Sequence, residues 1–539
     1  MASNDTDDAK LHDTAFFGHP RGLSTLFFTE MWERFSYYGM RAFLVLYMTA
    51  EVAKGGLGYG VARAGLVYGM YTSSVYLMSV PGGWIADRFL GLRRAVLLGG
   101  ILIMAGHVSL AMPLEGSFYV GLGLVVLGTG LLKPNISAIV GQLYGANDPR
   151  RDAGYSIYYM GINIGALVAP IACGFLAQSS TFQGWLSSAG IDPNSAWHFG
   201  FGAAAVGMFF GLVQYWLGSR HLGDAGGPPA PRETAAAKKR DRLILVAVLI
   251  GTFGVPILFG VLMAKGVIAN KEDLEHAFTY LLLSLTVALF AALYLWGCED
   301  SEERRRLTVI LVLFLGAVTF WAAFEQAGST LNLFAQEHTR NELLGIGFPA
   351  SYFQSINSVC VILLAPVFAA LWVYLGKRGK EPSSPIKFGI AQFLVALGFA
   401  VLIPAAITLD GPQTAFAALK GPFQHVLVSP GWLVALYFIH TAAEMCLSPV
   451  GLSSMSKLAP KRIGGLVMGI WFLAASWGNF LAGKAVGYTV TATYQSFFTG
   501  MIIFPVIMGM VLLVLAGPIR RMMSRNAAGG LPKATARKK

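Results

Sequence analysis

Charged residues are scarce in this chain of 539 residues, where Asp, Glu, Lys and Arg together make up 13%. Soluble domains carry roughly 25% charged residues, so most of this chain cannot form a water-exposed surface. Apolar residues account for 55% of the chain, and its 64 glycines are a share typical of helices that pack closely in lipid. The composition predicts a protein that crosses the membrane many times.

Cysteine is nearly absent, and the four that occur lie in or beside separate apolar runs at spacings that fit neither disulfides nor a zinc site. His440 and Glu444 are four residues apart, but no further ligand accompanies them. We therefore expect no metal and no cofactor. No hydrophilic segment is long enough to hold a catalytic domain, which argues against an enzyme.

Fourteen apolar runs of about 20 residues can be read along the chain, and each is long enough to cross a bilayer as a helix. They cover residues 24–50, 63–86, 94–112, 117–143, 152–178, 197–218, 243–264, 277–297, 307–334, 349–375, 386–409, 430–455, 464–488 and 494–519. Six precede a segment rich in Gly and Pro, two nearly uncharged runs follow it, and six more come after. This order predicts an all-α membrane protein with the major-facilitator fold, made of two six-helix bundles and an inserted helix pair.

The predicted domains are an N-terminal bundle over 1–218, a linker with two extra helices over 219–306, and a C-terminal bundle with a basic tail over 307–539. If both termini are placed inside, 30 of the 40 Lys and Arg residues fall on the cytoplasmic side. This asymmetry predicts cytoplasmic termini and a multi-pass protein of the plasma membrane, the inner membrane of a bacterium. The net charge of +12 is then explained by topology and indicates no nucleic-acid partner.

A few ionisable residues fall deep inside the predicted spans, where each costs about 2.5–3.5 kcal/mol and is usually functional. They are Glu30, Glu33, Arg34, Arg41, Lys133, Glu325 and Glu444. A rise of 1.5 Å per residue puts Lys133 near the level of Glu30, and puts Arg41 and Glu325 at depths of about 25 and 27 Å. We therefore expect Arg41 and Glu325 to pair across the two bundles. The alternative for the charges of the first span is an ion-pair ladder that only locks helices together.

Polar and aromatic side chains occupy the depths between these charges. Asn163, Asn357 and Glu444 lie near mid-depth, and the candidate aromatic walls around them are Tyr37, Tyr76, Tyr159, Trp321 and Trp471. For each aromatic residue, helix packing or anchoring at the membrane interface is the alternative. Charges placed to pair across two halves suit alternating access better than a static pore.

The segment 30–39 reads E-M-W-E-R-F-S-Y-Y-G and resembles the E-x-x-E-R-F-x-Y-Y-G signature of the proton-coupled oligopeptide transporter family, abbreviated POT or PTR. Further segments are similar to motifs of bacterial members or of major facilitators in general: 82–88, 132–135, 159–165, 320–329 and 444–451. The resemblance thus extends over most of the chain.

The resemblance implies a proton-coupled symporter that imports di- and tripeptides by alternating access. The proton-coupling residues would be Glu30, Glu33, Arg34, Lys133 and Glu325. Arg41 and Lys133 would hold the peptide carboxylate, Asn163, Asn357 and Glu444 its amino-terminal region, and Tyr37, Tyr76, Tyr159, Trp321 and Trp471 its side chains. Arg41 and Glu325 would form a gate.

The rival within this group is a proton-coupled carrier of nitrate or another small anionic metabolite. Lys133, Asn163 and Glu444 together favour a zwitterion instead. Animal relatives carry a functional His on the second span, but residues 63–86 contain none, so carboxylates must handle the proton here. We expect peptides, protons and the lipid bilayer as partners, and a monomer.

Overall fold

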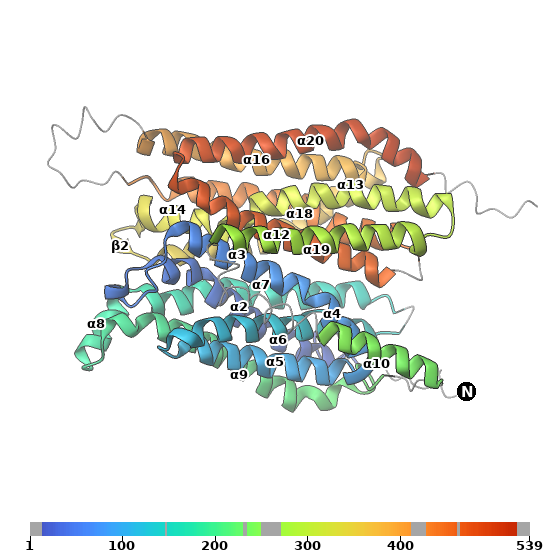
Figure 1. Ribbon diagram of the computed structural model, residues 1–539, viewed down its shortest axis with the longest axis horizontal. Helices are drawn as coiled ribbons and strands as arrows, with labels where there is room; N and C mark the ends of the chain where they lie inside the picture. Colours follow the sequence, from blue (N-terminus) through green and yellow to red (C-terminus); the bar gives the residue numbers. More distant parts are fainter. Residues whose placement is uncertain are drawn as a thin grey trace, which may run out of the picture.

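The computed structural model describes residues 13–145, 148–229, 234–249, 271–410, 427–460 and 464–524. These residues are almost entirely helical, and the long helices run side by side (Figure 1). The chain starts and α20 ends at the same end of the bundle, which we call the termini side; β2 and α8 lie at the other end, the opposite side (Figure 1).

The first group of helices consists of α2 (Gly22–Thr49), α3 (Val61–Leu77), α4 (Ser79–Ile85), α5 (Leu92–Ala111), α6 (Glu115–Gln142), α7 (Arg151–Gln178), α8 (Ser180–Ser188) and α9 (Ala196–Gly218). Two further helices follow, α10 (Ala235–Leu249) and α12 (Lys271–Ala292). The second group consists of α13 (Ser301–Phe324), α14 (Thr330–His338), α15 (Gln354–Lys377), α16 (Ser384–Asp410), α18 (Gly431–Leu458), α19 (Gly464–Val486) and α20 (Tyr494–Ser524). A small hairpin joins β1 (Glu342–Leu343) to β2 (Ile346–Gly347).

Eleven helical segments of the described residues are long and apolar enough to cross a membrane. The first predicted span, α2, is not counted among them because it carries four ionisable residues. The second predicted span is divided between α3 and α4, each of which is short. Most of the predicted span 243–264 lies outside the described residues, so the number fourteen stays a prediction.

Within the first group, α2 packs against α7 and α9, and α5 packs against α6. In the second group, α16 packs against α18 and α20, and α13 packs against α19. The two groups form two halves of the bundle (Figure 1). The domain boundaries predicted at 218 and 307 stay predictions.

The two groups meet where α3 packs against α19 and α7 against α15. Glycines bring α3 and α19 into backbone contact, because a Cβ atom added to Gly483 would collide with the backbone of Gly65 and Gly69. Close approach of this kind is how helices gain contacts in lipid, where no hydrophobic effect drives them together. A hydrogen bond of 2.7 Å between the hydroxyls of Ser73 and Ser476 reinforces the same contact.

The predicted run 307–334 is not one helix, which corrects the sequence interpretation. The α-helix α13 ends at Phe324, a turn of 3-10 helix covers Glu325–Gly328, and α14 begins at Thr330. Ser329, with φ of −125° and ψ of −97°, redirects the chain between them. The break places Glu325 at the end of a helix rather than in the middle of one.

The α3–α19 contact generates a stability prediction. The change Gly483→Val should lower the unfolding midpoint in detergent, because the added side chain must push the two backbones apart at a cost of about 1–3 kcal/mol. Gly500→Val on α20 is the matched control, since no heavy atom lies within 4 Å of a Cβ at that position. Equal thermal stability of the two variants would contradict the proposed backbone contact.

Candidate functional site

A cavity of about 290 Å³ lies between the two groups of helices. One wall comes from α2, α3, α6 and α7, and the other from α13, α15, α18 and α19. Twelve of the fourteen predicted site residues line it: Glu30, Arg34, Arg41, Tyr76, Lys133, Tyr159, Asn163, Trp321, Glu325, Asn357, Glu444 and Trp471. Residues spread over more than 400 positions of the chain are thus brought to one place.

Two carboxylates and one guanidinium are buried together on α2. Nε of Arg34 lies 3.2 Å from Oε1 of Glu30 and also pairs with Glu33. Helical spacing puts these side chains on one face, and the Arg34 guanidinium lies 5.3 Å from the centre of the Tyr37 ring. Among the described residues, Oε1 of Glu33 has no hydrogen-bond partner. The single guanidinium of Arg34 therefore pairs with the carboxylates of both Glu30 and Glu33.

Lys133 lies on the wall of the cavity beside this buried cluster. Its ammonium nitrogen is 4.1 Å from the centre of the Tyr76 ring, close enough for a cation–π interaction. The guanidinium of Arg34 and the carboxylates of Glu33 and Glu30 are all near enough to interact with it electrostatically. Within the described part of the chain, Lys133 forms no ion pair.

A second buried ion pair connects the two groups of helices. Arg41 on α2 pairs with Glu325 at the end of α13, and their side chains are only 7% and 5% exposed. Nε of Arg41 also donates a hydrogen bond of 2.6 Å to the hydroxyl of Tyr68 on α3. Gly328 is required for this approach, because a Cβ atom there would overlap the Tyr68 hydroxyl. Arg41 is thus bound by one side chain from each group of helices, Tyr68 and Glu325.

The second group contributes an acidic site to the cavity. The side-chain amide of Asn357 donates to Glu444 at 3.2 Å and to the hydroxyl of Thr441 at 3.0 Å. Across the described residues, Glu444 has no cation as a partner. Nε1 of Trp321 is buried and lacks a hydrogen-bond acceptor among the described residues. On the facing wall, the side-chain amide of Asn163 donates to the carbonyl of Tyr159 at 2.9 Å.

Two further hydrogen bonds join the first group of helices to the second. The amide of Asn332 on α14 donates to the carbonyl of Ala42 at 2.6 Å. The hydroxyl of Ser355 on α15 donates to the carbonyl of Leu167 at 2.7 Å. These bonds add to the Arg41–Glu325 pair in holding the two groups together.

Two predicted residues do not line the cavity. Glu33 is fully buried, and Tyr37 packs edge-on against Tyr38 at 5.3 Å between ring centres and is 2% exposed. Spacing along α2 placed both on the correct face of the helix, but helix spacing cannot tell the surface of a cavity from the layer behind it. In the structure Glu33 pairs with Arg34 and the Tyr37 ring lies beside the same guanidinium, and the contact of Tyr37 with a ligand stays a prediction.

The structure also adds residues that the sequence interpretation missed. The cavity is further lined by Tyr38, Gln354, Tyr437, His440 and Ser448. A signal existed for two of them, since His440 and Ser448 lie one helical turn before and after Glu444. A ring nitrogen of His440 is engaged by the carbonyl of Val395 at 3.1 Å.

Comparison with known proteins gives one consistent result. Residues 93–502 match the sequence profile of the POT family. The chain is 39% identical to the uncharacterized transporter YclF of Bacillus subtilis (strain 168), over 97% of this chain and 99% of that protein. It is 36% identical to the di-/tripeptide transporter of Lactococcus lactis subsp. cremoris, over 95% of this chain and 98% of that protein. The crystal structure of a peptide transporter POT in complex with sulfate is similar at a TM-score of 0.83 and 39% identity, over 96% of this chain and 99% of that one.

The Arg41–Glu325 pair generates the second prediction. Arg41→Ala or Glu325→Ala alone should lower the stability by about 3–5 kcal/mol, because each leaves an unpaired charge in a buried position. The double variant should lose clearly less than the sum of the single losses, measured as unfolding midpoints in detergent. The exposed pair of Lys54 and Glu51, 3.1 Å apart, is the matched control and should give additive losses. Additivity at Arg41 and Glu325 would mean that the two charges do not stabilise each other.

Proposed function

This chain belongs to the POT family, and we propose that it is a proton-coupled symporter that imports di- and tripeptides by alternating access. It is a transporter and not an enzyme. The observation that carries the proposal is the placement of cations and an anion in the cavity, with Lys133 and Arg41 contributed by the first group and Glu444 by the second. A peptide zwitterion carries the complementary pair of charges whatever its side chains are.

The two ends of the peptide are bound by different groups of helices. Lys133 receives the peptide carboxylate first, because Arg41 is already paired with Glu325. Glu444, oriented by Asn357, receives the terminal ammonium group. The rings of Tyr76, Tyr159, Trp321 and Trp471 leave space for varied side chains, which gives broad specificity. A bound peptide therefore joins the two halves of the transporter.

Proton coupling follows from the charge balance on α2. Glu30 and Glu33 share the guanidinium of Arg34, and the nearby ammonium group of Lys133 compensates the second carboxylate. When the peptide carboxylate binds Lys133, this compensation weakens. A buried, uncompensated charge is costly, so one of the carboxylates takes up a proton. Peptide and proton thus bind together.

The proton gradient then supplies the work. One proton moving through 100 mV releases about 2.3 kcal/mol, and each pH unit adds about 1.4 kcal/mol. The sum of about 3.7 kcal/mol is enough to accumulate peptide several hundredfold, since each 1.4 kcal/mol is worth about a factor of ten. Transfer of the proton back from the carboxylates to the cytoplasm resets the carrier.

Arg41 and Glu325 form the outer gate. The Lys and Arg distribution supports a cytoplasmic termini side, so the opposite side faces outward. Protonation of Glu325, or a peptide carboxylate offered to Arg41, weakens the ion pair and opens that side. We propose a monomer as the transporting unit, placed in the inner membrane of a bacterium.

The coupling role of Glu33 is testable. Glu33→Gln in proteoliposomes should abolish uptake driven by a pH gradient and preserve part of the counterflow exchange, because an amide keeps the shape of the carboxylate but cannot carry a proton. Glu51→Gln is the matched control, since Glu51 is exposed and lies outside the cavity. If Glu33→Gln still accumulates peptide against its gradient, Glu33 has no part in coupling.

Recognition of both peptide ends is tested by blocked substrates. A dipeptide with an acetylated amino group or an amidated carboxylate should compete at least tenfold less well than the free dipeptide, because an unmatched buried charge costs about 1.5–3 kcal/mol. In Glu444→Gln the difference in competition between the free and the acetylated dipeptide should be much smaller, because this variant has no carboxylate at position 444 to pair with the terminal ammonium group. Equal competition by free and blocked dipeptides, together with competition by nitrate, would instead favour a carrier of small anions.

A further inference from the structure

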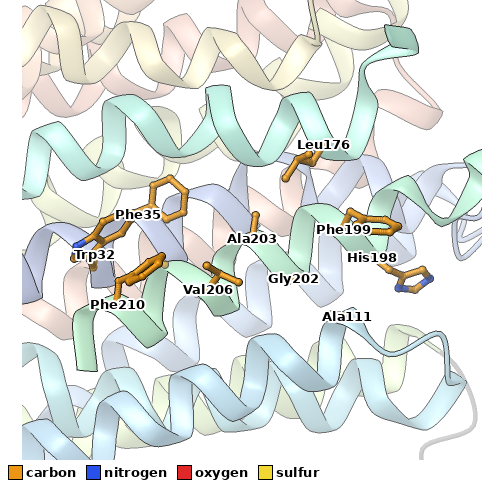
Figure 2. A pocket seen from close by; sticks show the side chains of 11 residues that line it. Trp32, Phe35, Ala111, Leu176, His198, Phe199, Gly202, Ala203, Val206 and Phe210 are labelled. Atoms are coloured by element: carbon orange, nitrogen blue, oxygen red, sulfur yellow. The ribbon is translucent and has the colours of Figure 1, made fainter. Parts of the chain in front are cut away.

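A long apolar groove opens on the outer surface of the first group of helices (Figure 2). Its volume is about 630 Å³. The side chains of Trp32 and Phe35 on α2, Leu176 on α7, and Phe199, Val206 and Phe210 on α9 form its walls. Trp32 and Phe210 lie at one end of the groove, and His198 and Phe199 lie at the other (Figure 2). None of its lining residues contributes to the cavity described above.

Small residues of α9 form the floor of the groove. Gly202 and Ala203 lie between the walls, and no heavy atom lies within 4 Å of a Cβ placed on Gly202. Gly207 differs from Gly202, because a Cβ there would collide with the ring of Phe35. The groove is therefore open space over Gly202, in a surface that is otherwise built from large aromatic side chains.

The end of the groove at His198 lies near the membrane interface. Phe199 packs 5.5 Å from Phe182 of α8, and Trp185 of the same short helix is exposed on the opposite side. Exposed aromatic rings of this kind gather at the level of lipid headgroups. The imidazole of His198 packs edge-on against the ring of Tyr47 at 6.0 Å between ring centres, and its Nδ1 is buried rather than open to the groove. His198 is the only ionisable side chain in the lining of the groove.

The length of the groove along α9 indicates what kind of ligand fits it. The eleven steps along α9 from Phe199 to Phe210 give a rise of about 16 Å, and half of a ~30 Å hydrocarbon core is about 15 Å. The groove therefore reaches from the interface to the middle of the bilayer. Its lining is apolar except for His198, and it is continuous with the surface of spanning helices that lipid covers.

We propose that this groove binds one acyl chain of a phospholipid from the leaflet on the opposite side. The chain packs against Trp32 and Phe35, which flank Glu33 and Arg34 on α2. The bound lipid thus packs against the outer face of the α2 segment that carries the buried ion pair. This binding does not depend on which substrate the cavity takes.

Native mass spectrometry of the full chain, titrated with palmitoyl-oleoyl phosphatidylethanolamine in a mild detergent, tests the proposal. The unmodified chain should bind one phospholipid at least tenfold more tightly than Gly202→Leu, whose side chain fills the groove. Gly123→Leu is the matched control, because Gly123 on α6 is equally unobstructed but lies outside the groove. Val206→Trp fills the groove from its wall and should reproduce the loss.

Crosslinking locates the bound lipid. A phosphatidylethanolamine with a diazirine at the middle of one acyl chain should label Ala203, Val206 or Phe210 in proteoliposomes, and Gly202→Leu should reduce this labelling at least fivefold while Gly123→Leu leaves it unchanged. The proposal is overturned if all variants bind and crosslink lipid equally. It is also overturned if the groove instead holds a second copy of the chain, seen as a dimer that Gly202→Leu dissociates.

Discussion

Arg41 and Glu325 form a single buried ion pair that ties the two groups of helices together at the opposite side. Neither charge could remain in this low-dielectric position alone, since removing one partner of a buried pair costs several kcal/mol. The pair therefore exists only while the groups are closed, and separation of the groups requires another source of compensation. Tyr68 and the close approach at Gly328 hold the pair in place. The outer gate that we propose depends on this interaction.

The cost of burying an unpaired charge also applies to the rest of the cavity. There, several charged groups have fewer partners of opposite charge than they could bind. The carboxylates of Glu30 and Glu33 share the guanidinium of Arg34. Among the described residues Lys133 forms no ion pair, and Glu444 accepts a hydrogen bond from the neutral amide of Asn357. Each of these groups gains from a ligand of opposite charge or from a proton. In the mechanism that we propose, a zwitterion and a proton together supply the missing charges, so one cavity can bind both.

On the outer surface of the helices the protein contacts lipid instead of water, so electrostatic pairing matters less there than in the cavity. Shape and apolar contact decide what binds, as in the groove over Gly202. The same surface accepts the inserted helix α12, which packs Phe278 against Phe480 of α19 at 4.9 Å between ring centres. An ion pair of 2.6 Å between Glu275 and Lys484 fixes that helix near the contact between α3 and α19.

Most of the helices and all of the Glu, Lys and Arg residues that line the cavity could be predicted from the sequence. Buried charge is costly in a bilayer, so each charge inside a long apolar span is conspicuous. The apolar and uncharged polar residues of the lining were predicted only in part. Depth along a helix follows from residue number, so the common level of Arg41 and Glu325 was visible as well. The tertiary structure alone decided the break after Phe324, the partner role of Tyr68 and the burial of Tyr37 behind the cavity wall. These features depend on which helices are neighbours and how closely their backbones approach, and the periodicity of a single helix carries no information about either.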